Sequence, residues 1–218
     1  MSGHSQFSLL TKRRFLPLFV TQAIGAFNDN AFRLSLATLY VYGPLREVVK
    51  NPDAANSILA ALLVLPFFLF SALAGQLADK FDKAVIARRV KLIEIFLIAV
   101  ASYSLYTEMI WLQFLCIFGA GIIAAFFGPI KYSILPQHLA KDELLGGNGM
   151  IESGTAISIL LGMLFGSFFV LGGYGRHFVS AIMIGLAVIA YVSAWFIPKA
   201  PSAQPDICLL YTSDAADE

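Results

Sequence analysis

The residues of this 218-residue chain that could do chemistry are the charged and amide side chains that interrupt its long apolar segments. The densest group is Asn28, Asp29, Asn30 and Arg33, all within the first apolar segment. Residues four apart share one face of a helix, so Asp29 and Arg33 can form an ion pair. A charge inside a bilayer is costly unless it is paired or hydrated, so this group should face the interior of a helical bundle. It either fixes the segment to its neighbours or lines a substrate path, and the two adjacent amides favour the path.

A second group joins the fourth and fifth apolar segments. Lys131 lies near the end of the fourth segment and Glu152 near the start of the fifth, so both side chains are expected at the same side of the membrane. The pair is either a structural link between helices or a site where Lys131 meets an anionic phosphate as a point charge. Glu94, in the third segment, is expected to pair with Arg88 or Lys91 and to have a structural role.

Composition places these groups in a membrane protein. Hydrophobic residues make up 58% of the chain and mean hydropathy is +0.76. Charged residues make up 13%, about half of the ~25% that soluble domains carry. Six apolar segments each supply the ~20 residues that a bilayer requires, so the expected fold is all-α with six transmembrane helices. The segments span residues 15–42, 57–78, 85–106, 109–135, 147–171 and 177–197, with Pro44 ending the first and Pro129 interrupting the fourth.

Basic residues predict the orientation of the six segments. Lys and Arg precede the first segment, cluster around the connection between the second and third, and recur after the fourth and sixth. The opposite side holds only Arg46, Lys50 and Arg176. Because basic loops face the cytoplasm, both ends of the six-segment unit (residues 15–197) should be cytoplasmic, with residues 1–14 as a cytoplasmic N-terminus.

The connection between the second and third segments reads G-Q-L-A-D-K-F-D-K over residues 75–83. Gly75 permits close helix approach, and the alternating charges of Asp79, Lys80, Asp82 and Lys83 can bind helix ends and one another at the membrane surface. The pattern resembles the signature loop of the major facilitator superfamily, G-x-L-A-D-x-x-x-[KR], which joins the second and third helices. That resemblance implies a role in conformational gating.

Two further patterns concern packing. Small residues recur at every fourth position of the fifth segment, at Gly154, Ser158, Gly162 and Gly166, which predicts a face for close packing or sliding rather than a binding site. The first and fourth segments both carry an Ala-Phe pair followed by a basic residue. This weak similarity is consistent with the 3+3 inverted repeat from which each half of a major facilitator protein is built.

Longer strings narrow the resemblance to one family. They are RRFLPLF at 13–19, GAFNDNAFR at 25–33, FGPIKYSILPQHL at 127–139 and ELLGGNGMIE at 143–152. These strings are similar to the bacterial lysophospholipid transporters over about residues 9–199. Asn28 favours the version that is fused ahead of an acyltransferase and an acyl-carrier-protein ligase.

The resemblance implies a multi-pass protein of the bacterial inner membrane that moves lysophospholipid, such as lysophosphatidylethanolamine, to the inner leaflet for re-acylation. The polar group around Asp29 would then meet the headgroup, and Phe-rich walls would hold the acyl chain. A complete protein would have a second six-helix half, with the substrate cavity between the halves. Two alternatives stay open: the chain begins a bifunctional acyltransferase, or it is a facilitator for another small solute.

The C-terminal residues depart from that pattern. Residues 198–207 read as the start of a linker between two halves, whereas residues 208–218 resemble translated sequencing-adapter sequence and are expected to be an artefactual tail. The chain is thus expected to be an N-terminal fragment. The sequence carries no catalytic motif, cofactor-binding glycine loop, metal-ligand spacing or nucleic-acid footprint, so no cofactor, metal or nucleic-acid partner is predicted.

Overall fold

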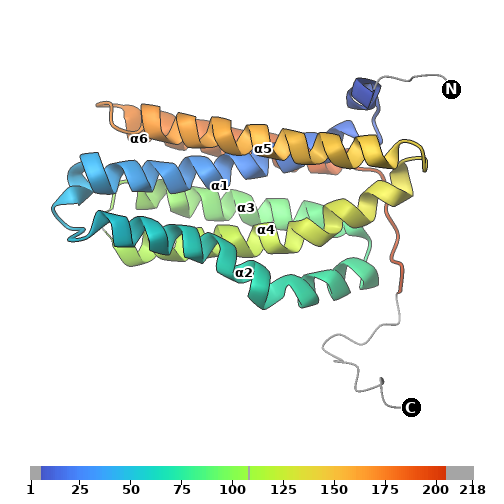
Figure 1. The fold of residues 1–218 in the computed structure, drawn as a ribbon, viewed down its shortest axis with the longest axis horizontal. Coiled ribbons are helices and arrows are strands. Elements are labelled where there is room, and N and C mark those ends of the chain that lie inside the picture. Colours follow the sequence, from blue (N-terminus) through green and yellow to red (C-terminus); the bar gives the residue numbers. More distant parts are fainter. Residues whose placement is uncertain (1–5, 108, 205–218) are drawn as a thin grey trace, which may run out of the picture.

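The computed structural model describes residues 6–107 and 109–204, and within them the chain forms six α-helices and two short 3-10 helices. The α-helices run back and forth and make an elongated antiparallel bundle (Figure 1). In chain order the elements are η1 (Gln6–Thr11), α1 (Leu16–Tyr42), η2 (Pro44–Arg46), α2 (Pro52–Lys80), α3 (Lys83–Ser104), α4 (Ile110–His138), α5 (Leu144–Phe169) and α6 (Gly175–Trp195).

Each predicted apolar segment corresponds to one α-helix, but the boundaries differ by up to five residues. The largest difference is at α2, which begins at Pro52 instead of residue 57. Asn51 caps this helix, since its side-chain oxygen accepts a hydrogen bond from the Ala54 N–H at 3.1 Å. Hydrophobicity marks the part of a helix that suits lipid, whereas capping groups mark where the helix itself begins.

The prediction that Pro129 interrupts the fourth segment is wrong. Helix α4 runs without a break from Ile110 to His138 and contains both Pro129 and Pro136, and α2 contains Pro66. A proline removes one backbone hydrogen bond and bends a helix, but packed neighbours hold both halves of a membrane helix together. Both α2 and α4 bend along their length in Figure 1.

Four of the six α-helices, α2, α4, α5 and α6, are long and apolar enough to cross a membrane by composition alone. The other two helices are more polar along their length: α1 carries Asn28, Asp29, Asn30 and Arg33, and α3 carries Arg88, Arg89, Lys91 and Glu94. With 27 and 22 residues, α1 and α3 are about 40 Å and 33 Å long at ~1.5 Å per residue. Helix length therefore does not separate α1 and α3 from the other four helices, and the overall polarity of their sequences does.

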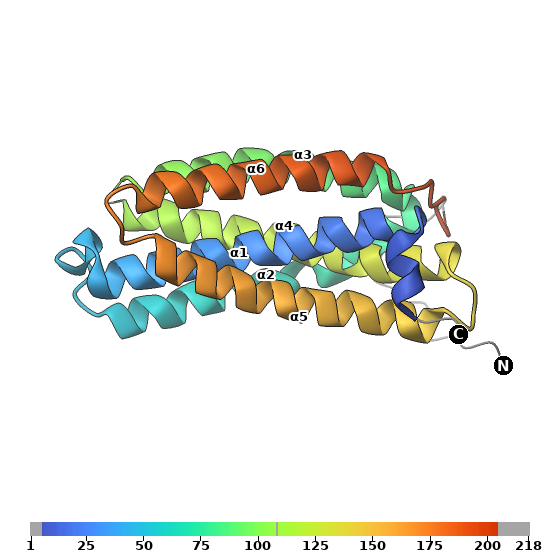
Figure 2. The same ribbon diagram turned by 90° about the horizontal axis from the view of Figure 1, so that it is seen from above.

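Three helix pairs account for most of the packing: α1 with α5, α2 with α4, and α3 with α6. Helix α1 also packs on α6, and α3 on α4. Viewed from above, α3 and α6 lie on one side and α2 and α5 on the other, with α1 between them (Figure 2). Two apolar cores form, one around Leu36, Tyr40 and Ile117 and the other around Phe15 and Ile134. The stretches of α1 and α3 between these cores hold the polar residues.

The small-residue stripe of α5 lies against α1. A Cβ added at Gly162 would overlap the carbonyl oxygen of Phe27, and one added at Gly166 would overlap the carbonyl oxygen of Ala31. A Cβ at Gly154 would overlap the Phe19 ring. Ser158, the remaining member, is half-buried. Glycine at these positions lets the backbones of α1 and α5 touch.

The expected domain boundaries lie partly outside the described residues. The proposed six-helix unit, residues 15–197, is described except for residue 108, and η1 precedes it. Of the expected linker at 198–207, residues 198–204 are described and follow α6 across the end of the bundle. The expected artefactual tail at 208–218 lies outside the described residues.

Candidate substrate cavity and the network at the basic end

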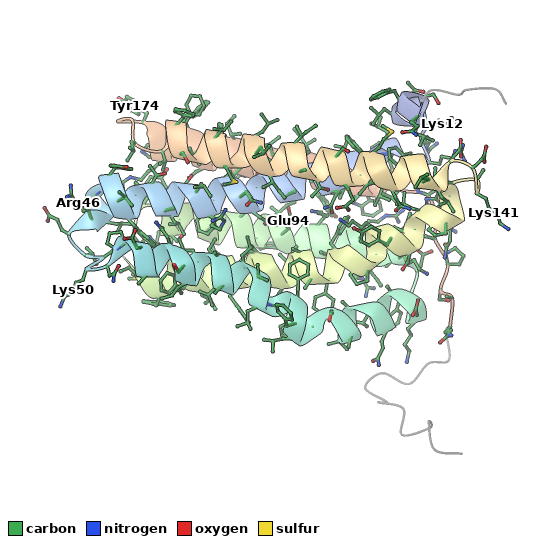
Figure 3. The ribbon with its side chains drawn as sticks, viewed as in Figure 1. Lys12, Arg46, Lys50, Glu94, Lys141 and Tyr174 are labelled. Carbon is green, nitrogen blue, oxygen red and sulfur yellow. The ribbon has the colours of Figure 1, made fainter. Side chains whose placement is uncertain are left out.

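A cavity of about 320 Å³ lies between α1, α2, α3, α4 and α5, in the stretch that separates the two apolar cores. Glu94, one of its lining residues, is midway along the bundle, whereas Lys12 and Lys141 mark one end and Arg46 and Lys50 the other (Figure 3). The polar lining is Gln22, Asp29, Asn30, Lys91, Glu94, Lys131 and Thr155. Apolar walls come mainly from Leu63, Val64, Phe67, Ile123 and Phe127.

Two of the four polar candidates on α1 line this cavity, Asp29 and Asn30. Asn28 instead faces α6, where its fully buried amide nitrogen donates to the Met183 carbonyl oxygen at 3.1 Å. Arg33 is half-buried and is not among the lining residues. Asn28 and Asp29 point to different neighbours because consecutive helical residues point about 100° apart. The role of this group in a substrate path stays a prediction.

The expected ion pair between Asp29 and Arg33 does not form. Asp29 instead lines the same cavity as Lys91 and Glu94. Arg33 lies one turn further along α1, toward the end that carries Arg46. Spacing along one helix determines which of its side chains are close enough to form an ion pair. Charged residues on a neighbouring helix can compete for the same side chain, so spacing alone does not determine the partner. Within the described residues the ion pairs are Lys12–Glu143, Arg14–Glu143, Lys91–Glu94 and Lys131–Glu152.

The pair formed by Lys91 and Glu94 is the most buried charged group in the cavity. Lys91 Nζ lies 2.5 Å from Glu94 Oε2 and 4.8 Å from the centre of the Phe127 ring, and both charged side chains are about 3% exposed. The second carboxylate oxygen, Glu94 Oε1, is buried without a hydrogen-bond partner. The sequence predicted this pairing but assigned it a structural role only. The sequence feature that could have indicated a functional role is the carboxylate of Glu94 inside an apolar segment, because ionisable residues within membrane segments are commonly functional.

Gly25 makes room for this pair. A Cβ at Gly25 would lie 2.6 Å from Lys91 Nζ and 3.7 Å from Glu94 Oε1, so even an alanine would push the ammonium group from its position. Helix α1 therefore presents a bare backbone surface to the charged end of Lys91. The close approach of a lysine to a helix backbone explains why glycine stands at this position.

Lys131 and Glu152 form the second charged pair. Lys131 Nζ donates to Glu152 Oε1 at 3.0 Å and lies 4.7 Å from the centre of the Tyr132 ring. The Tyr132 hydroxyl donates to the same carboxylate oxygen at 2.6 Å. The two partners differ in exposure, with the Lys131 side chain at 9% and the Glu152 side chain at 53%. Lys131 thus lines the cavity while Glu152 holds it from outside.

The cavity combines two cations with apolar walls. Each cation, Lys91 and Lys131, is held by one carboxylate and one aromatic ring. An anionic group that enters the cavity can compete with either carboxylate for its lysine, because an ammonium group forms charge-assisted hydrogen bonds to phosphate as well as to carboxylate. Such a site suits a molecule with a charged head and an apolar tail. The described residues contain no group of three or more His, Cys, Asp and Glu side chains that could hold a metal ion.

The signature sequence at 75–83 covers the last turns of α2, the two-residue connection formed by Phe81 and Asp82, and the first residue of α3. Asp82 caps α3, since its side-chain oxygen accepts hydrogen bonds from the Ala84 N–H at 2.9 Å and the Val85 N–H at 3.3 Å. Lys80 is the last residue of α2. A Cβ at Gly75 would have no neighbour within 4 Å, so close packing inside this chain does not require glycine there.

The same loop holds the segment that follows α6. The Asp79 carbonyl oxygen accepts hydrogen bonds from the Ala203 N–H at 3.0 Å and the Gln204 N–H at 2.9 Å. Lys83, although 1% exposed, donates from its ammonium group to the Pro201 carbonyl oxygen at 3.0 Å. Lys83, through its side chain, and Asp79, through its backbone carbonyl, therefore both bind backbone groups of the segment that follows α6.

The N-terminal segment binds the connection between α4 and α5. Lys12 and Arg14 both donate to Glu143 Oε1, at 2.9 Å and 2.7 Å, and Arg14 also donates to the His138 carbonyl oxygen at 2.9 Å. The hydrogen bond from Lys12, followed by that from the Ala140 N–H, lowers the pKa of Glu143 from 4.5 to about 2. These contacts tie the start of the chain to the end of the bundle that carries most of its basic residues.

An antiparallel helical bundle with several membrane-spanning helices and a charged cavity at mid-length defines a multi-pass membrane protein of the transporter class. Residues 18–207 match the sequence profile of the Major Facilitator Superfamily, and the chain belongs to that superfamily.

Similar proteins are named lysophospholipid transporter LplT. The protein of Klebsiella pneumoniae subsp. pneumoniae is 32% identical over 211 residues, which cover 94% of this chain and 48% of that protein. The protein of Photorhabdus laumondii is 30% identical over 212 residues, with the same coverage of 94% and 48%. The protein of Salmonella paratyphi B is 33% identical over 197 residues, covering 87% of this chain and 44% of that protein. The chain spans about half the length of the curated relatives it matches.

Proposed function

We propose that all six α-helices cross the membrane and form one half of a transporter, with both ends of the six-helix unit in the cytoplasm. The lengths of α1 and α3, about 40 Å and 33 Å, suit the ~30 Å hydrocarbon layer. Three of their charged residues, Asp29, Lys91 and Glu94, are acceptable at mid-length because they face the cavity instead of lipid. Basic residues gather at the end marked by Lys12 and Lys141 in Figure 3, which supports a cytoplasmic position for that end.

The packing pattern supports a 3+3 repeat. If α1, α2 and α3 correspond to α4, α5 and α6, the contact of α1 with α5 is equivalent to that of α4 with α2. The contact of α1 with α6 is then equivalent to that of α4 with α3, and the pair α3 and α6 maps onto itself. These are the main packing pairs of the bundle. Inverted three-helix repeats of this kind build the halves of major facilitator proteins.

We propose that the complete protein, of which this chain is one half, moves lysophospholipid such as lysophosphatidylethanolamine across the bacterial inner membrane for re-acylation. The observation that carries the proposal is the cavity, which offers cations for a phosphate and apolar walls for an acyl chain. The names of the similar proteins point to the same substrate class. The second half would close the open side of the cavity.

Residue roles follow from the cavity geometry. Lys131 is the phosphate partner, since it is a point charge on the cavity wall whose present partner, Glu152, is half-exposed. Asp29 and Asn30 face the headgroup from α1, and the pair of Lys91 and Glu94 sets the local charge. The loop at 75–83 controls opening at the cytoplasmic end. None of these roles is catalytic, and acyl transfer would belong to another protein or to a fused domain.

The test is translocation of radiolabelled lysophosphatidylethanolamine into proteoliposomes by the two-half protein and its variants. Lys131→Gln and Asp29→Asn should each reduce the rate about tenfold or more, since a charge-assisted hydrogen bond is worth ~1.5–3 kcal/mol. Arg46→Gln is the matched control, because Arg46 is exposed at the opposite end and lines no part of the cavity. Normal translocation by a folded Lys131→Gln variant would remove the assigned role of that lysine. A normal translocation rate in a folded Arg33→Ala variant would show that Arg33, which does not line the cavity, is not part of the substrate path.

The same assay separates the alternatives. A facilitator for another small solute predicts that no lysolipid crosses even with the unchanged protein. A bifunctional acyltransferase predicts that diacyl lipid accumulates when an acyl donor is added to the lysolipid. Absence of lysolipid transport would overturn the proposed substrate. Accumulation of diacyl lipid would show that the complete protein also has acyltransferase activity.

A further inference from the structure

A second hollow lies at the basic end of the bundle, away from the substrate cavity. It is a groove of about 560 Å³ between the start of α1 and the end of α6. Leu16, Pro17 and Val20 line it from α1, and Phe196 lines it from the end of α6. The groove shares no lining residue with the cavity at mid-length. Its walls are open to the surroundings, since Leu16 is 39% exposed and Phe196 53%.

A cation without a partner stands at the mouth of this groove. Lys12, Arg13 and Arg14 are consecutive, and the outer two both bind Glu143. Arg13 is exposed and lines the groove, and it has neither a hydrogen bond nor an ion pair within the part of the chain that the structure describes. A guanidinium group beside an exposed apolar groove, at the level where α1 enters the bundle, is complementary to a phosphodiester joined to acyl chains.

We propose that this groove binds one anionic diacyl phospholipid of the adjacent membrane leaflet. The phosphodiester lies against Arg13, and an acyl chain lies along Leu16, Val20 and Phe196. The lipid is anionic because the residues that line the groove include no carboxylate, so a headgroup ammonium would find no partner there. Both hydroxyl groups at the groove already have acceptors: Ser193 donates to the Pro17 carbonyl oxygen at 3.0 Å, and Thr11 donates to the Ser8 carbonyl oxygen at 2.8 Å. Arg13 is therefore the recognition group.

The groove is a site for a resident lipid, and it is separate from the path of a transported one. Its location beside Pro17 and the segment after α6 places the lipid at the joint between the start of α1 and the end of α6. A bound lipid would fill this joint and stabilise the contact between the two helices. The proposal does not depend on the transported substrate.

The experiment is native mass spectrometry of the purified chain in detergent, titrated with phosphatidylglycerol or phosphatidylethanolamine. We expect one phosphatidylglycerol to bind more tightly than later ones and more tightly than phosphatidylethanolamine. Arg13→Gln should weaken this first binding about fivefold or more, the change that follows from ~1 kcal/mol per basic residue at an anionic surface. Arg89→Gln is the matched control, because Arg89 is exposed, lies on α3 near the same end and is not part of the groove.

A second variant tests the apolar part of the site. Val20→Trp should fill the groove and reduce binding of phosphatidylglycerol without any change in charge. Equal losses in Arg13→Gln and Arg89→Gln would overturn the proposal, since they would indicate general surface attraction. Equal binding of phosphatidylethanolamine, or equal binding of lysophosphatidylglycerol, would overturn the assignment of an anionic diacyl lipid. A circular dichroism spectrum of each variant shows whether the helical bundle has formed.

Discussion

Gly121 on α4 gives the sharpest test of how the cavity wall is held. A Cβ at this position would lie 2.5 Å from the Leu63 carbonyl oxygen, 2.8 Å from Pro66 Cγ and 3.1 Å from the Leu62 carbonyl oxygen. Contacts of Cβ below 3.0 Å are essentially never seen, so α2 and α4 must separate by about 0.5 Å or more in Gly121→Ala. The nearest atoms belong to backbone and to a proline ring, which cannot rotate away. We expect overpacking to cost ~1–3 kcal/mol.

A control is needed because alanine also favours helix formation over glycine by ~1 kcal/mol. Gly185 on α6 has no atom within 4 Å of an added Cβ, so Gly185→Ala carries the propensity gain alone. Gly119 on α4 is an intermediate case, since its Cβ would meet only the flexible end of Leu97 at 2.9 Å. The difference between Gly121→Ala and Gly185→Ala therefore isolates the packing cost between α2 and α4.

The assay is thermal unfolding of the purified chain in detergent, followed by circular dichroism. One kcal/mol corresponds to roughly 2–4 °C in Tm for a chain of this size, so Gly121→Ala should unfold several degrees below Gly185→Ala, with Gly119→Ala between them. Leu63 also lines the cavity, so translocation by the two-half protein should fall in the same order. Equal Tm values for Gly121→Ala and Gly185→Ala would refute the close backbone contact between α2 and α4.

Two further predictions concern the end of the bundle that carries Lys12. The pKa of Glu143 is lowered to about 2, so its stabilising contact with Lys12 is complete above the ordinary pKa of 4.5 and is lost as the pH falls toward 2. The difference in Tm between the unchanged chain and Glu143→Gln should therefore be constant at neutral pH and shrink below pH 4.5, and a difference that persists at pH 2 would contradict the assignment. Asp82→Ala should lower stability by ~1 kcal/mol because α3 loses its cap, whereas Asp82→Asn, which can still accept both N–H groups, should lose little. Equal Tm values for the two variants at Asp82 would show that capping is not its contribution.

Several features of the protein follow from the sequence alone, because they depend on local physics. Apolar segments of bilayer length predicted all six helices, since backbone groups in an apolar segment must bond internally and a helix satisfies them within one segment. Spacing predicted that Glu94 pairs with Arg88 or Lys91, and the structure selects Lys91. The four-residue repeat of small residues on α5 predicted a packing face. The link between Lys131 and Glu152 followed from the order of the segments and the side of the membrane at which they end.

Only the tertiary structure decided which polar groups face one another. Asn28 and Asp29 are neighbours in sequence, yet one binds α6 and the other faces the cavity, because helix rotation against two different partners sets their directions. Asp29 lines the same cavity as Lys91 and Glu94 instead of pairing with Arg33, since α3 brings charges into the cavity that no spacing within α1 can indicate. Helix α4 continues through Pro129 because neighbouring helices hold the parts of the helix on both sides of it. The sequence shows which charged residues lie in apolar segments, where an unpaired charge is energetically unfavourable. The contacts between helices determine which neighbouring group stabilises each charge.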